Sequence, residues 1–207
     1  MIVGVMASGD ESLAKKHQGL AKQVGSAIAQ LGFHLLTGGG NGLMKAVGQS
    51  FLDEKRKLLK TKAGNLISVL RAEELPKLHK DGKRTWKANA DNGLGEIVIR
   101  THLPLSGNKG SDPLSRNHIN ALTADCVVIL PGGSGTLSEL RLASEYGKDI
   151  MIFVGKGNVG GKTSEELAKD FRGIEIGSNE QELRSWLKSK LKKSEGLVLE
   201  SAKTIIR

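Results

Sequence analysis

Residues 126–139 read CVVILPGGSGTLSE, and the rest of the fold can be worked out from them. The apolar first half of this stretch predicts a buried strand, and its second half predicts a glycine-rich turn that opens a helix. The N–H groups of a first helical turn lack partners inside the helix and carry partial positive charge, so this turn suits a phosphate. Glycines let an anion approach the main chain because they have no Cβ. The stretch therefore predicts an anion site at the end of a strand.

Two charged residues accompany this predicted anion site. We expect Glu139 to lie in the first helical turn beside the anion, where it either takes part in chemistry or only stabilises the helix end. Arg116, in SRNHIN (115–120), falls at the start of the helix before the strand. Such a helix begins on the side of the sheet where the following strand ends, so Arg116 can approach Glu139. An arginine grips phosphate or carboxylate as a fork, although it can also pair with a surface acid. Facing Arg116 at a helix N-terminus, Glu139 is expected to be ionised at neutral pH.

The order of elements predicts the rest of the fold. Apolar runs at 2–7, 33–36, 66–70, 96–100, 126–130, 150–154 and 174–176 read as strands. Helical patterns separate most of them, including one helix from Asp10 or Ser12 to Leu31 and a last one capped by Ser178 with Gln181. We therefore expect an α/β protein with a Rossmann-like, doubly wound parallel sheet in a single domain over residues 1–193, followed by a tail at 194–207. In such sheets ligands bind where strands end, which adds the glycine turn Gly38–Gly42 to the site.

Composition limits the class of protein. A chain of 207 residues fits one domain, and the polar, basic segment 71–94 reads as an insertion or flap. The net charge of +9 gathers at 55–62, 77–87 and 184–193, which suits anionic ligands, nucleic acid or a merely solvated basic face. Aromatic residues, at 3%, are too few for base-stacking platforms. The single cysteine, Cys126, is expected to be an inert core residue in a cytoplasmic protein. We expect no signal peptide, membrane span or metal site.

A second glycine-rich segment, VGKGNVGGKT (154–163), ends like a phosphate-binding P-loop. Lys156 stands where that motif needs its first glycine. The segment is thus a degenerate nucleotide loop or a mobile loop at the edge of the site.

The pattern P-G-G-x-G-T-x-x-E, with Arg116 lying 23 residues before Glu139, resembles the LOG family, named after the plant "lonely guy" enzymes. The run TGGGNGLM (37–44) is similar to the family's first glycine segment but one residue shorter. In its detail (Arg116-Asn117, Asn120, Ala124-Asp125, then 132–139) the chain looks most like the molybdenum-cofactor carrier branch.

This resemblance implies a function and a set of site residues. LOG enzymes hydrolyse the N-glycosidic bond of nucleoside 5′-monophosphates without a cofactor, which assigns Arg116 and Glu139 as the catalytic pair. The oxocarbenium-like state of that reaction is stabilised by a carboxylate. Phosphate or nucleotide binding is assigned to Gly132, Gly133, Ser134, Gly135 and Thr136, to Gly39, Gly40 and Asn41, and to Ser8 and Asn117.

Two alternatives stay open beside the hydrolase. The carrier branch implies a non-catalytic protein that binds a nucleotide or the molybdenum cofactor. The basic charge allows a nucleic-acid-binding module. Family members are usually dimers or larger, so we expect a homo-oligomer.

Overall fold

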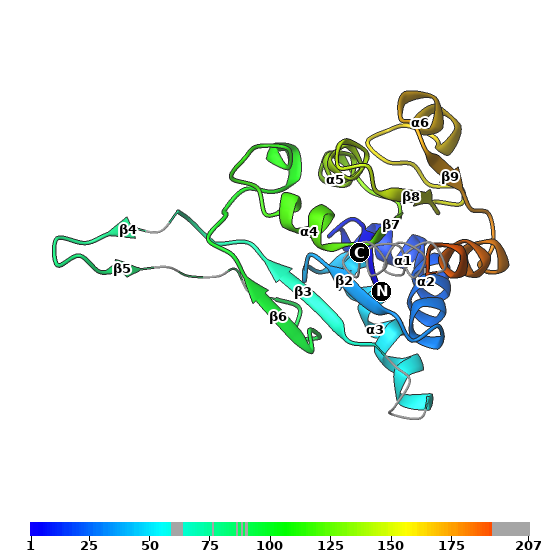
Figure 1. Cartoon of the computed structure of the whole chain (residues 1–207), viewed down its shortest axis with the longest axis horizontal. Coiled ribbons are helices and arrows are strands. Elements are labelled where there is room, and N and C mark those ends of the chain that lie inside the picture. The colour runs from blue at the N-terminus through cyan, green and yellow to red at the C-terminus, as the bar shows by residue number, and fades with distance from the viewer. Residues whose placement is uncertain (59–63, 76, 86, 88, 90, 192–207) are drawn as a thin grey trace, which may run out of the picture.

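The computed structural model describes residues 1–58, 64–75, 77–85, 87, 89 and 91–191. Seven parallel strands form one sheet in the order β6-β3-β2-β1-β7-β8-β9 (Figure 1). The strands are β1 (Ile2–Met6), β2 (His34–Thr37), β3 (Leu66–Leu70), β6 (Ile97–Arg100), β7 (Cys126–Ile129), β8 (Asp149–Ile152) and β9 (Ile174–Ile176). The predicted parallel α/β sheet in a single domain is confirmed, with β9 at the edge.

The strand order reverses at the centre of the sheet. From β1 the chain proceeds outward through β2, β3 and β6, and then returns to place β7 on the other side of β1, with Val3 opposite Cys126. In open α/β sheets ligands bind at the carboxyl ends of the strands beside such a reversal. The ends of β1 and β7 therefore mark the expected site.

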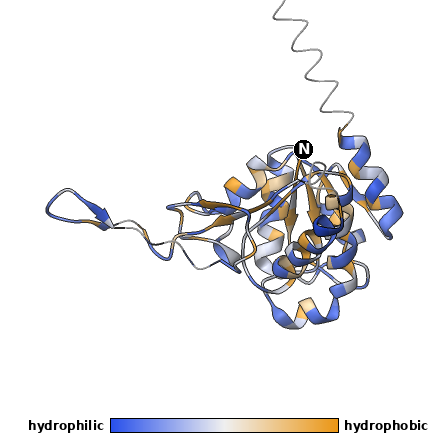
Figure 2. Ribbon diagram, turned by 90° about the horizontal axis from the view of Figure 1, so that it is seen from below, coloured by the Kyte–Doolittle hydropathy of each residue, from blue (hydrophilic) through white to orange (hydrophobic). Residues whose placement is uncertain are grey.

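Helices cover both faces of the sheet (Figures 1 and 2). One face packs against α1 (Glu11–Lys16), α2 (Gln18–Gln30), α3 (Gly42–Lys57) and the last helix, 180–191. The other face packs against α4 (Asn117–Thr123), α5 (Ser134–Glu145) and α6 (Ser164–Asp170). Cys126 is fully buried in the first of these two core layers, as predicted.

Two helix boundaries differ from the sequence prediction. The single helix expected from Asp10 to Leu31 is two helices, because the chain breaks at His17 (φ −117°, ψ 23°). Asp10 is the N-cap of α1, and its carboxylate accepts from the backbone N–H of Ser12 at 2.7 Å. The last helix is capped by Asn179 rather than Ser178, since the Asn179 Oδ1 accepts from the N–H of Glu182, 3.0 Å away.

The basic insertion contains a hairpin, β4 (Lys77–Leu78) and β5 (Arg84–Thr85), that projects away from the body (Figure 1). Its base is joined by a hydrogen bond from the N–H of Asn89 to the carbonyl of Arg71, at 2.9 Å. The predicted tail, 194–207, lies outside the described residues. Within the described ranges no helix is long and apolar enough to cross a membrane.

Candidate functional site

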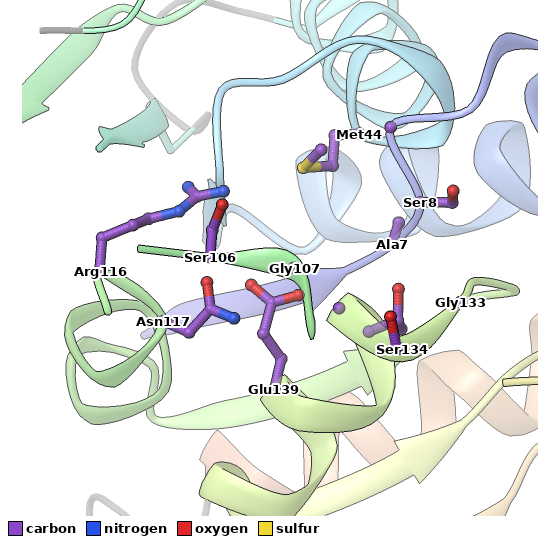
Figure 3. Close-up of a pocket in the computed structure, with 13 residues that line it drawn as sticks. Ala7, Ser8, Met44, Ser106, Gly107, Arg116, Asn117, Gly133, Ser134 and Glu139 are labelled. Atoms are coloured by element: carbon purple, nitrogen blue, oxygen red, sulfur yellow. The ribbon is translucent and has the colours of Figure 1, made fainter. Parts of the chain in front are cut away.

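A cavity of about 310 Å³ lies at the carboxyl ends of β1 and β7 (Figure 3). The start of α5 forms one wall, and the chain after β1, the first turn of α3, the 106–107 loop and the start of α4 form the others. Its lining residues are Ala7, Ser8, Gly9, Met44, Ser106, Gly107, Arg116, Asn117, Gly133, Ser134, Gly135, Thr136 and Glu139. Eight of these residues are among those that the sequence assigned to the site.

The glycine turn leaves the start of α5 open toward the cavity. Gly133 is the N-cap and no side chain caps this helix end, so its first N–H groups face the space where an anion would bind. Gly132 lies behind the turn and does not line the cavity. A Cβ on Gly132 would lie 2.0 Å from the Thr136 Oγ1, so only glycine fits there.

The second glycine-rich segment braces this turn and is not a nucleotide loop. The N–H of Gly132 donates to the carbonyl of Asn158 at 3.0 Å, and the N–H of Gly160 donates back to the carbonyl of Gly132 at 2.8 Å. Lys162 pairs with Asp170, and the Thr163 hydroxyl caps α6. The groups that would hold a phosphate in a P-loop are therefore engaged elsewhere, and residues 155–163 line neither this cavity nor the one next to it.

Glu139 lies in the second turn of α5, not in the first as predicted. Its side chain points into the cavity toward Asn117 and Gly107 (Figure 3), yet only 6% of the residue is exposed. Burial raises the pKa of Glu139, opposed by the charge of Arg116 and by a 3.0 Å hydrogen bond from the Asn120 Nδ2. We predicted an ionised Glu139 from the helix N-terminus and from the positive charge of Arg116. Burial adds an effect in the opposite direction and is the largest influence on this pKa, because desolvation penalises the charged form.

Arg116 is the N-cap of α4, as expected, and lines the same cavity as Glu139. Its guanidinium extends toward Ser106 rather than toward Glu139 (Figure 3), and its Nη1 donates to the carbonyl of Val69 at 2.5 Å. A Cβ on Gly38 would lie 2.3 Å from both terminal nitrogens. Glu139 and Arg116, which are both described, form no ion pair with each other. Arg116 instead ties the end of β3 to the first glycine turn.

That first glycine turn lines a neighbouring cavity of about 190 Å³. Gly39 and Gly40 belong to it, as do Arg71 and Asn89 from the base of the insertion. Asn41 is exposed as the N-cap of α3 and lines neither cavity. The two cavities share three residues: Met44, Ser106 and Arg116.

Several lining residues were not assigned to the site from sequence. The 105–113 segment packs onto α5: the Ser138 hydroxyl donates to the carbonyl of Gly107 at 3.3 Å. Its glycines were the only signal, and nothing local in them points to α5. Asn120 belonged to the quoted motif, but its contact with Glu139 depends on how α4 packs against α5.

Among the described residues, three buried side-chain atoms lack a hydrogen-bond partner, and all three lie near the two cavities. They are the Ser68 Oγ, the Arg116 Nε and the Asn120 Oδ1. Arg116 lines both cavities, Asn120 contacts Glu139, and the Ser68 Oγ lies 3.4 Å from the Cβ position of Gly39. Buried polar groups are normally paired, so these three atoms are exceptions within the described chain. No group of His, Cys, Asp and Glu in the described chain could hold a metal ion.

Residues 1–183 match the SLOG cluster4 family. The chain belongs to this family. Among solved structures, this SLOG cluster4 protein is similar to the molybdenum cofactor carrier protein of Chlamydomonas reinhardtii (22% identity, TM-score 0.66), over 92% of this chain and 98% of that one. The molybdenum cofactor binding protein of Rippkaea orientalis is 26% identical with a TM-score of 0.61, over 92% and 96%.

A more distant likeness is to DNA processing protein A of Helicobacter pylori, at 15% identity and a TM-score of 0.57, over 91% of this chain and 80% of that one. A search of curated proteins found no match. The predicted likeness to molybdenum-cofactor carriers is thus confirmed at the level of the fold.

Proposed function

We propose that this SLOG cluster4 protein binds a phosphorylated organic ligand at the start of α5, and that this ligand is the molybdenum cofactor. The observation that carries the proposal is the uncapped helix start, which opens into a cavity that also holds the Arg116 side chain. The similar structures named for this cofactor, matched over nearly their whole length, support the choice of ligand.

The residues present fit such a cargo through its phosphate. The main chain of Gly133–Thr136 and the hydroxyl of Ser134 would hold the phosphate, with Ser8 and Asn117 completing the wall. Recognition would depend on the phosphate and the organic part of the ligand, since the described residues offer no metal-binding cluster.

The test compares the protein as purified with two variants at the same position. Bound cofactor is measured as molybdenum and pterin released per chain after expression in cells that make the cofactor. Ser134 is exposed, so neither variant disturbs the core. Ser134→Glu places a negative charge in the phosphate position and should abolish the cofactor content, whereas Ser134→Ala should keep most of it. Equal content in both variants, or none in the unaltered protein, contradicts the proposal.

The hydrolase is a second candidate, favoured by the position of Glu139 beside the helix start. In this reaction the bond from ribose C1′ to the base nitrogen breaks, water supplies the hydroxyl on C1′, and a proton reaches the leaving base. A carboxyl with a raised pKa suits a general acid better than the ionised role expected from sequence. Arg116 would then position the first glycine turn. Release of adenine from AMP that is lost in Glu139→Gln would support this candidate, and no release at equimolar protein would eliminate it.

The basic hairpin favours nucleic acid as a possible additional partner. Lys77, Lys80, Lys83 and Arg84 are exposed on an arm that projects from the body, and the similar Helicobacter pylori protein is named for its single-stranded DNA binding mode. Binding of single-stranded DNA should weaken steeply with added salt, because lysines and arginines release counterions. A flat salt response, or unchanged binding after Lys80→Glu with Arg84→Glu, eliminates this partner.

We also propose a homo-oligomer. Ile97 and Ile99 on β6 are 43% and 36% exposed. They pair with Ile67 and Val69, whose side chains pack against Ile119 of α4, so all lie on one face of the sheet. Exposed apolar groups at a sheet edge mark contact surfaces. Sedimentation should show a dimer or larger assembly that dissociates in Ile99→Glu, and a monomeric unaltered protein would refute this.

A further inference from the structure

We propose that the ligand carries two anionic groups, one at the start of α5 and a second between Arg71 and Arg116 in the neighbouring cavity. This inference rests on the proposed function and specifies the chemical class of ligand: an organic compound with a phosphate at one end and a further anion at the other. The observations that lead to it concern the second cavity.

The second cavity is lined by two arginines and by no acid. Arg71 and Arg116 both line it, and none of its lining residues, all within the described chain, is Asp or Glu. Burial lowers the pKa of Arg116 most, the charge of Glu139 raises it, and the charge of Arg71 lowers it, so the two arginines lie close enough to interact. Like charges that share a small cavity repel each other unless an anion lies between them. Glu139 lines only the first cavity, so within the second cavity no lining residue balances the two arginines, and an anionic group of the ligand would do so.

Arg116 has hydrogen-bonding capacity left for such a group. The residue is only 8% exposed, its Nη1 is bonded to the Val69 carbonyl, and its Nε has no partner. A buried guanidinium nitrogen without an acceptor is costly. An anion in this cavity would give that nitrogen an acceptor.

The insertion is what builds the second cavity. Arg71 is held by a 3.2 Å hydrogen bond from its Nη1 to the carbonyl of Pro104. Asn92 fixes the glycine turn opposite, its Nδ2 donating to the carbonyl of Gly40 at 2.7 Å. The segment after β3 thus serves two purposes, since its base closes a binding cavity while its tip forms the projecting hairpin.

The wall shared by the two cavities indicates an organic ligand rather than two separate ions. Met44 lines both cavities and presents an apolar, adaptable thioether between the two cationic regions. Ser106 also lines both cavities. A ligand with an apolar or ring-shaped middle and two anionic ends would place its middle against Met44 and its ends in the two cavities.

The experiment measures affinities by calorimetry for AMP and for two compounds with one more phosphate, ADP and adenosine 3′,5′-bisphosphate. At least one of the latter should bind about tenfold more tightly than AMP, which is about 1.4 kcal/mol. Arg71→Gln should remove that gain while AMP affinity stays within about twofold. The matched control is Arg100→Gln, which removes the same charge from an exposed position on β6 and should change neither affinity.

Asn89→Asp is a second variant, and it keeps the hydrogen bond from the backbone N–H of residue 89 to the carbonyl of Arg71. It adds a negative charge to the second cavity and should also weaken only the doubly phosphorylated compounds. If AMP binds but gains nothing from either added phosphate, or if Arg71→Gln weakens all three compounds equally, this inference fails and the proposed function stands. If none of these compounds binds, this inference fails, and the proposed function fails with it only if the purified protein also carries no cofactor.

Discussion

Gly38→Ala tests the contact between the first glycine turn and Arg116. The new Cβ would lie 2.3 Å from the Nη1 and Nη2 of Arg116 and 2.6 Å from its Cζ. Gly38 does not have a positive φ, so alanine adds no backbone strain there. The cost therefore comes from displacing a buried guanidinium.

The magnitude follows from what Arg116 would lose. Its hydrogen bond to the Val69 carbonyl involves a charged group, worth about 1.5–3 kcal/mol, and overpacking a buried site costs about 1–3 kcal/mol. The two costs do not add fully, because a guanidinium that moves away from the new Cβ loses its hydrogen bond but no longer overlaps with that Cβ. We expect a loss of about 3 kcal/mol in unfolding free energy, which for a chain of this length is a fall of roughly 6–12 °C in Tm.

The assay is urea denaturation of Gly38→Ala, Arg116→Ala and the double variant. Alanine at position 116 removes the group that the new Cβ would meet, so Gly38→Ala should cost less than about 1 kcal/mol in that background. Gly19→Ala is the control: Gly19 is exposed on α2 with no atom within 4 Å of its Cβ position, and its change should be neutral or slightly stabilising. A Gly38→Ala protein as stable as the unaltered one, or an equal cost in the Arg116→Ala background, refutes the reasoning.

Three further predictions concern buried groups. Because burial raises the pKa of Glu139, its negative charge lowers the stability of the folded protein above that pKa and has no effect below the unfolded value near 4.5. Glu139→Gln should therefore raise the unfolding free energy at pH 7. A gain of the same size at pH 4 would contradict this. Gly25→Ala should destabilise by about 3 kcal/mol in urea denaturation, since its Cβ would lie 2.5 Å from the Val47 carbonyl where α2 crosses α3; a near-neutral result would show that the helices can separate. Burial raises the pKa of Cys126 to about 12, so a thiol reagent should label it only as fast as the protein unfolds, and rapid labelling of the folded protein would disprove this.

The arrangement of elements was predictable because its signals are local. The strand Ile174–Ile176 lies where the sequence predicted one. The strand and turn at 126–135 follow from an apolar run and glycines within a few residues of each other. Arg116 and Glu139 line one cavity because a helix before a parallel strand must begin where that strand ends.

The environment of each group at the site depended on segments far apart in the chain. Glu139 is buried because α4 packs against α5, and Arg116 turns to Val69 and Gly38 because β3 and β2 end beside it. The second cavity exists because Arg71 and Asn89 fold back beside the first glycine turn. The amino-acid sequence alone was enough to place the site at the carboxyl edge of the sheet, since strand direction and glycine turns are encoded locally. The orientation of Arg116 and the direction in which the pKa of Glu139 shifts follow from the tertiary structure, because desolvation depends on everything packed around a group.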